Sequence, residues 1–102
     1  MEKQFKILES SPLQVRNYTD RNGEPKVFKY RPFIISDGID KMYAEAQGEY
    51  AESIATRNFA LGTAYTISLN ISMREWQAQD GTKRFNNDAI IRRIGDAANE
   101  IF

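Results

Sequence analysis

The sequence contains neither cysteine nor histidine. Without cysteine there is no disulfide framework, thiol nucleophile or thiolate metal site, and without histidine the commonest general base and metal ligand is missing. Apolar runs extend over only a few residues, and none follows the polar start of the chain, so we expect no membrane span, no secretion signal and a cytoplasmic location. Phosphate-binding glycine loops are also absent. These absences favour a non-catalytic protein without metal or cofactor.

The composition is that of a globular domain. The chain has 102 residues, of which 41% are hydrophobic, and its 14 basic side chains balance 14 acidic ones. This apolar fraction argues against intrinsic disorder, and the length favours one core. We therefore expect a single domain over residues 1–102, although basic residues gather in the expected strands and acidic ones between and after them.

The clearest pattern lies in the C-terminal half. Apolar and polar residues alternate from Tyr65 to Met73, which is the period of a half-buried strand. Asp80-Gly81 then supplies a turn, and a β-like pattern resumes from Arg84 to Ile94. The sequence predicts a hairpin over about 62–94, followed by a short tail at 95–102.

The N-terminal third predicts a second hairpin, over about 3–36. Segments 13–19 and 26–35 flank a turn marked by Asn22-Gly23, and residues 3–8 are expected to begin the first strand. Pro32 cannot donate to a strand ladder, so its strand should lie at an edge, bulge or bend there.

Between the hairpins, apolar residues recur at spacings of three and four, which predicts an amphipathic helix over about 39–55 capped by Asp37 or Asp40. The residues that carry this spacing are Ile39, Met42, Tyr43, Ala46, Tyr50 and Ile54. The expected fold class is mainly β with one helix.

Trp76 is the most informative single residue. Continuing the strand's alternation places it with Arg74 on the polar face. There an aromatic ring beside guanidinium groups forms a stacking platform for single-stranded nucleic acid. The alternative is that the strand bends and Trp76 folds back onto the core.

A second set of aromatic and basic residues lies in the segment 26–33. Phe28 and Tyr30 share one strand face, and Lys29 and Arg31 share the other. This interleaving suits a surface that follows phosphates while stacking bases, but it also suits an edge strand whose charges deter aggregation. Basic residues are further concentrated in the second hairpin, whereas paired carboxylates lack a third convergent ligand. The predicted nucleic-acid-binding residues are Phe28, Lys29, Tyr30, Arg31, Arg74, Trp76, Lys83, Arg84, Phe85 and Arg92.

Four motifs of the second hairpin resemble the last two barrel strands of the single-stranded DNA-binding protein (SSB) family. They are Leu61-Gly62, Arg74-Glu75-Trp76, Asp80-Gly81-Thr82-Lys83-Arg84 and Phe85. Val15-Arg16-Asn17-Tyr18-Thr19 followed by Asn22-Gly23 is similar to the family's first hairpin. The resemblance implies a small oligonucleotide-binding (OB) barrel. It also implies largely sequence-independent binding of single-stranded DNA in replication, recombination or mobile-element maintenance.

Two departures from the family shape the expectations. No full third strand is evident between Phe33 and Ile39, so we expect a barrel of five strands or one that lacks part of a strand. The net charge of zero favours an alternative, in which the chain is an OB-fold protein-interaction module with weak or no nucleic-acid binding. RNA is a third possible partner. We also expect a homo-dimer or homo-tetramer joined through edge strands at 3–8 or 26–31.

Overall fold

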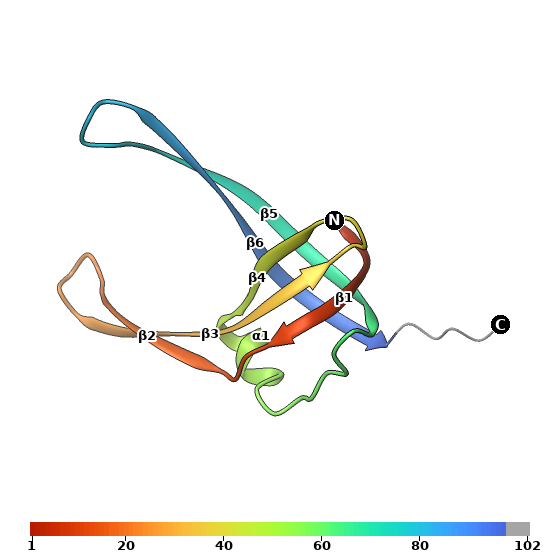
Figure 1. Ribbon diagram of the computed structural model, residues 1–102. Helices are drawn as coiled ribbons and strands as arrows, with labels where there is room; N and C mark the ends of the chain where they lie inside the picture. The colour runs from red at the N-terminus through yellow and green to blue at the C-terminus, as the bar shows by residue number, and fades with distance from the viewer. Residues whose placement is uncertain (98–102) are drawn as a thin grey trace.

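The computed structural model describes residues 1–97 and consists mainly of strands (Figure 1). In chain order the elements are β1 (Glu2–Ser10), β2 (Gln14–Thr19), β3 (Pro25–Ser36), β4 (Lys41–Gln47), α1 (Gly48–Ser53), β5 (Ala64–Gln77) and β6 (Lys83–Ala97). The expected tail 95–102 divides at Ala97, because residues 95–97 continue β6. Residues 98–102 lie outside the described part of the chain.

The six strands form one sheet, and five of them close into a ring. Their order is β1-β5-β6-β4-β3-β2, and β1 also pairs with β3. The first part of β1 pairs with β5, and its second part, from Lys6 to Ser10, pairs with β3. The ring is completed by β4, which runs antiparallel to β3 and parallel to β6. Strand pairing therefore passes through β1, β3, β4, β6 and β5 and returns to β1.

The core fills the inside of this ring. Alternate residues of the strands point inward, among them Ile7, Ile35, Ala46 and Ile67, each with no exposed surface. Ala51 and Ile54, from α1 and the residue after it, join the same cluster. The ring and the helix thus share one hydrophobic core.

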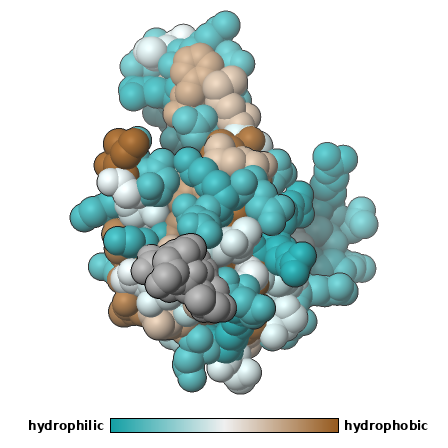
Figure 2. Space-filling view, turned by 90° about the vertical axis from the view of Figure 1, so that its right-hand side faces the viewer, coloured by the Kyte–Doolittle hydropathy of each residue, from teal (hydrophilic) through white to brown (hydrophobic). Residues whose placement is uncertain are grey.

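Two hairpins continue beyond the ring as two-stranded arms (Figure 1). The β2–β3 arm pairs Gln14–Thr19 with residues 25–30, and the β5–β6 arm pairs residues 71–77 with 83–89. In the space-filling view the β5–β6 arm rises above the body, and its surface mixes hydrophilic and hydrophobic side chains (Figure 2). The arms explain why the molecule measures 54 Å along its longest axis and only 19 Å along its shortest.

Both predicted hairpin turns are present. The backbone N–H of Asp20 donates to the carbonyl of Glu24 at 2.9 Å, and that of Ala78 donates to Thr82 at 2.9 Å. β1 is a separate strand rather than the beginning of β2, because Pro12 and its neighbours interrupt the pairing after Ser10.

Pro32 bends no edge strand but lies where β3 changes partner. β2 pairs with β3 as far as Tyr30, and β1 takes over from Phe33. The carbonyl of Pro32 accepts a bond from Ser11 N on that side at 3.1 Å. The backbone N and O of one strand residue point to the same side of the strand. The nitrogen of Pro32 therefore faces the gap between β1 and β2, where no strand would accept a hydrogen bond from it, so no ladder bond is lost.

The predicted helix over about 39–55 is wrong for most of its length. Residues 41–47 form β4, and only Gly48–Ser53 are helical. Met42, Ala44 and Ala46 also alternate with polar residues, and pairing with β3 and β6 selects this period of two over the helical one. Asp37 caps a tight turn rather than a helix, since its Oδ1 accepts from the backbone N–H groups of Ile39 and Asp40.

This correction supplies the strand that the sequence did not reveal between Phe33 and Ile39. The strand begins two residues later, at Lys41, after a turn in which Gly38 has a φ of 97°. Gly48, with a φ of 61°, then ends β4 and begins the short helix.

Matched truncations test the position of the core. Ile35 is fully buried inside the ring, whereas Ile39 is 89% exposed in the β3–β4 turn. Ile35→Ala should lower the free energy of unfolding by about 2–5 kcal/mol, and Ile39→Ala should change it by less than about 0.5 kcal/mol. Urea denaturation of both variants measures the difference. Equal losses would contradict the described burial.

Candidate nucleic-acid interface

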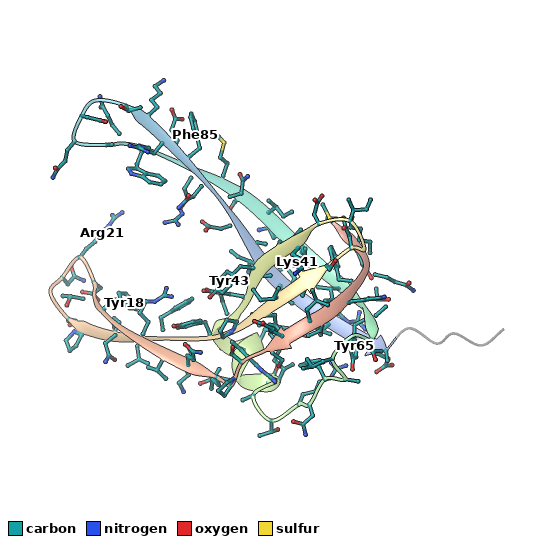
Figure 3. The ribbon with its side chains drawn as sticks, viewed as in Figure 1. Tyr18, Arg21, Lys41, Tyr43, Tyr65 and Phe85 are labelled. Carbon is teal, nitrogen blue, oxygen red and sulfur yellow. The ribbon has the colours of Figure 1, made fainter. Side chains whose placement is uncertain are left out.

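A groove of about 790 Å³ lies where the two arms leave the body. Side chains from β2, β3, β4, β5 and β6 line it, and Tyr43 lies between the bases of the arms (Figure 3). The lining residues are Arg16, Phe28, Met42, Tyr43, Glu45, Gln47, Ile71, Arg74, Asn87, Asp88, Ala89 and Ile90. The groove is therefore built by both arms and by the strand between them.

Strand register explains which side chains meet beside this groove. Residues directly opposite each other in an antiparallel pair point to the same face. On the β2–β3 arm Arg16 lies opposite Phe28, and on the β5–β6 arm Trp76 lies opposite Arg84. Period-two alternation then extends each face along its strand. The outward face, which we call the groove face, carries Gln14, Arg16, Tyr18, Phe28, Tyr30, Tyr43, Glu45, Gln47, Arg74, Trp76, Arg84, Asp88 and Ile90. Four other residues that line the groove, Met42, Ile71, Asn87 and Ala89, alternate with these and belong to the opposite face of their strands.

An aromatic and cationic cluster occupies the β2–β3 side of the groove face. The rings of Phe28 and Tyr30 are nearly parallel, with centroids 6.0 Å apart and planes inclined by 15°. The guanidinium carbon of Arg16 lies 4.5 Å from the Tyr30 centroid and 5.8 Å from that of Phe28. Such cation–π contacts hold the charge against the rings. The cluster offers flat π-surfaces next to a positive charge.

Glu45 lies beside this cluster in the floor of the groove. Its Oε2 accepts a hydrogen bond from the Tyr43 hydroxyl at 2.5 Å, and its Oε1 accepts from Gln47 Nε2 at 3.3 Å. Arg16 Nη2 lies 3.9 Å from the same Oε2. Partial desolvation of the half-exposed phenol first, and then the bond to Glu45, raise the pKa of Tyr43 to about 12. The carboxylate is thus fixed in place by its neighbours on β4.

Trp76 and two arginines occupy the β5–β6 side. Trp76 is 45% exposed, so it does not fold back onto the core. Arg74 Nε lies 2.5 Å from Asp88 Oδ2, and Arg84 lies opposite Trp76 with its Nη2 4.0 Å from Asp80. The arm therefore presents an accessible indole on the same strand face as two arginines.

Five of the ten predicted binding residues share the groove face: Phe28, Tyr30, Arg74, Trp76 and Arg84. Lys83 and Phe85 are on the opposite face of the β5–β6 arm, where Lys83 pairs with Glu75 at 3.6 Å. Figure 3 shows Phe85 on the side of this arm that faces away from the β2–β3 arm. Lys29 binds Glu52 of α1, and Arg92 is an exposed residue of the body at an irregularity of the β5–β6 ladder.

Arg31 is placed in the interior. Arg31 is only 6% exposed. Its Nη1 donates to the carbonyl of Ile54 at 2.5 Å and to that of Arg57 at 2.8 Å. Nε donates to Ser11 O at 2.8 Å, and Nη2 to Ser10 Oγ at 2.9 Å. Burial lowers the pKa of Arg31. These bonds join β1, β3 and the segment after α1, so we remove Arg31 from the proposed interface.

The sequence-based prediction missed the middle of the groove. Tyr43, Glu45 and Gln47 were assigned to a helix, whereas their alternation with Met42, Ala44 and Ala46 was the signal for a strand. Arg16 was overlooked because it is isolated from other basic residues in the sequence. Its position opposite Phe28 depends on the register of the hairpin.

Within residues 1–97 no group of three or more acidic residues is arranged to hold a metal ion. Among the helices of that part of the chain, none has the length and apolarity to cross a membrane. No protein-family model matches the chain, and a search of curated proteins found no match.

The ionisation of Tyr43 tests the geometry of the groove floor. The wild-type phenolate absorbance minus that of Tyr43→Phe should show a midpoint near pH 12 rather than the usual 10. Glu45→Gln should lower this midpoint, because it removes a negative charge and a strong acceptor. Since the folded-state pKa is raised, the stability contributed by Tyr43 is complete below pH 10 and is lost as the pH rises through 12. A midpoint near 10 in the wild type would contradict the contact.

Proposed function

We propose that this protein binds single-stranded DNA without catalysis, by base stacking in the groove and neutralisation of phosphates along its rim. The observation that carries the proposal is the placement of Phe28, Tyr30, Arg16 and Trp76 on one face that runs across both arms. Stacking of bases on aromatic rings is tolerant of sequence, because every base has a π-face. Replication, recombination and mobile-element maintenance are the settings in which such binding is used.

The strand connections support an OB-type barrel for this ring. The ring joins β1 to β3, β3 to β4, β4 in parallel to β6, and β6 to β5, which returns to β1. OB folds bind oligonucleotides across their second and third strands and beside the loops that connect strands 1–2 and 4–5. Here β3 and β4 are the second and third strands of the ring, and the two arms stand at those two connections. This position of the groove supports the proposal that it is an OB-type ligand site.

A specific feature favours the alternative of a protein-interaction module. All three arginines of the groove face are matched by carboxylates, Arg16 by Glu45, Arg74 by Asp88 and Arg84 by Asp80. A groove whose charges cancel attracts phosphates less strongly than an uncompensated basic surface. The affinity for oligonucleotides at low salt distinguishes the two functions, because the interaction module would bind them weakly or not at all.

Titration of oligo-dT tests the proposed function directly. Trp76 is the only tryptophan, so its fluorescence reports the β5–β6 arm alone. We expect binding at low salt with quenching of that fluorescence, because a base stacks on the exposed indole. Anisotropy of a labelled oligonucleotide measures binding independently, and oligo-rU in parallel compares RNA. Binding without any change in fluorescence would exclude stacking on Trp76, and no binding would favour the interaction module.

The salt dependence tests which face meets the phosphates. Arg84 and Lys83 are neighbours on opposite faces of the β5–β6 arm. Arg84→Gln and Lys83→Gln each remove one positive charge, so the two variants are matched in charge. Each phosphate contact contributes about −0.7 to the slope of log affinity against log salt on single strands. We expect Arg84→Gln to flatten the slope by about that amount and Lys83→Gln to leave it unchanged. The reverse result would place the phosphates on the Phe85 face.

We also propose a homo-oligomer, joined through β2 rather than through residues 3–8 or 26–31, the two edges that the sequence suggested. Residues 25–30 pair with β2, and Tyr30 and Arg31 also pair with β4. β1 pairs with β5 and β3 along most of its length, so residues 3–8 offer little free edge. β2 pairs only with β3, and all six of its residues are exposed. A second copy of β2 would extend the β2–β3 arm across a two-fold axis. Light scattering at micromolar concentration should give a mass of a dimer or tetramer, and a mass near 11.7 kDa that persists with oligonucleotide bound would contradict this.

A further inference from the structure

The carboxylate of Glu45 is an unexpected group at the centre of a surface that meets nucleic acid. Its side chain is 13% exposed, and its position is held from two sides by Tyr43 and Gln47. A carboxylate only accepts hydrogen bonds, and each of its oxygens has two acceptor positions. One bond from Tyr43 and one from Gln47 therefore leave acceptor capacity on both oxygens for a ligand.

Glu45 lies within reach of a base stacked on the aromatic cluster. Gln47 is directly opposite Tyr30 in the β3–β4 ladder, and Glu45 is two residues away on the same strand face. Such diagonal neighbours have Cα atoms about 7–8 Å apart, a distance that long and aromatic side chains span. A base stacked on this aromatic cluster beside the Arg16 guanidinium, which lies over Tyr30, can therefore present one polar edge to Glu45.

Arg16 completes the polar set around that edge. Its Nη2 is 3.9 Å from Glu45 Oε2, while its guanidinium rests over the Tyr30 ring. Two carboxylate oxygens followed by a guanidinium N–H form the sequence acceptor, acceptor, donor. The complementary edge of a ligand must read donor, donor, acceptor.

Among the DNA bases, guanine has this edge in the order N2–H, N1–H and O6. Thymine presents one donor between two carbonyl acceptors. A carboxylate repels these carbonyl oxygens. Adenine and cytosine each offer one amino donor followed by an acceptor at the ring nitrogen, so either satisfies only one oxygen. Proteins commonly read unpaired bases by combining an aromatic stack with hydrogen bonds to this edge. We propose that Phe28, Tyr30, Glu45 and Arg16 form a guanine subsite within the groove.

This inference rests on the proposed function and refines it. Binding remains tolerant of sequence at the other positions, including Trp76, where stacking alone acts. A single preferred base would fix the register of the strand in the groove. A carboxylate repels phosphates, so Glu45 is unfavourable on a surface that only neutralises them. A contact with guanine would explain why Glu45 is there.

The test uses one oligo-dT host with a single central base that is varied. The variants are thymine, guanine, adenine, cytosine and hypoxanthine, which lacks the 2-amino group of guanine. We expect guanine to bind about five- to a hundredfold more tightly than thymine, the range of a good bidentate base contact. Hypoxanthine should lose part of this gain, because one of the two donors to Glu45 is missing.

Matched variants assign the preference to Glu45. Glu45→Gln should reduce the ratio of guanine to thymine affinity to less than about twofold, because one carboxylate oxygen becomes a donor. Glu49→Gln removes the same charge from the exposed first turn of α1, so it should preserve the ratio. Tyr43→Phe, which keeps the net charge but removes the hydroxyl that orients Glu45, should lower the ratio in part. Thermal unfolding of each variant establishes that it is folded.

Each contrary outcome has a distinct meaning. Equal affinity for guanine and thymine in the wild type would overturn the guanine subsite and leave the proposed function standing. A preference that survives Glu45→Gln in a folded variant would overturn the assignment to this residue. Failure of the wild type to bind any of the oligonucleotides at low salt would overturn both proposals together.

Discussion

The structure depends on the double pairing of β1. One short strand bonds to β5 through its first half and to β3 through its second, and this closes the ring. Closure fixes an inside, which Phe5, Ile7 and the alternate residues of the other strands fill. Because side chains alternate along every strand, a sealed inside requires that the remaining residues point outward. The groove face is therefore a direct consequence of the closed core.

The arms convert that outward face into a concave surface. Each arm is a hairpin whose inner end belongs to the ring and whose outer end has no further strand beside it. Burial falls along β5 from alternating buried residues near the ring to a continuous run of exposed residues beyond Leu69. Such two-stranded segments gain little from packing. Trp76 is exposed there and Tyr30 is only half-buried, at a cost in free energy that a stacking ligand would offset.

Local patterns in the sequence predicted some parts of this arrangement well and others poorly. The alternation from Tyr65 to Met73 and the turn at Asp80-Gly81 gave the β5–β6 hairpin, because both signals are local. β4 was missed because its residues satisfy the helical and the strand period together, and only pairing with distant strands decides between them. Half of the predicted binding residues lie on the groove face, because alternation along a strand is also a local signal. The burial of Arg31 could not be predicted, because its acceptors come from Ser11, Ile54 and Arg57, far apart in the chain.

The central claim is that one face, formed by both arms and β4, meets the nucleic acid. Backbone amide shifts of an isotope-labelled sample, recorded while a short oligonucleotide containing one guanine is added, test this claim most directly. The account predicts changes that concentrate at Arg16, Phe28, Tyr43 and Trp76, with small changes around α1 and along residues 2–10. Changes that concentrate around α1, or along the exposed edge of β2 alone, would contradict it.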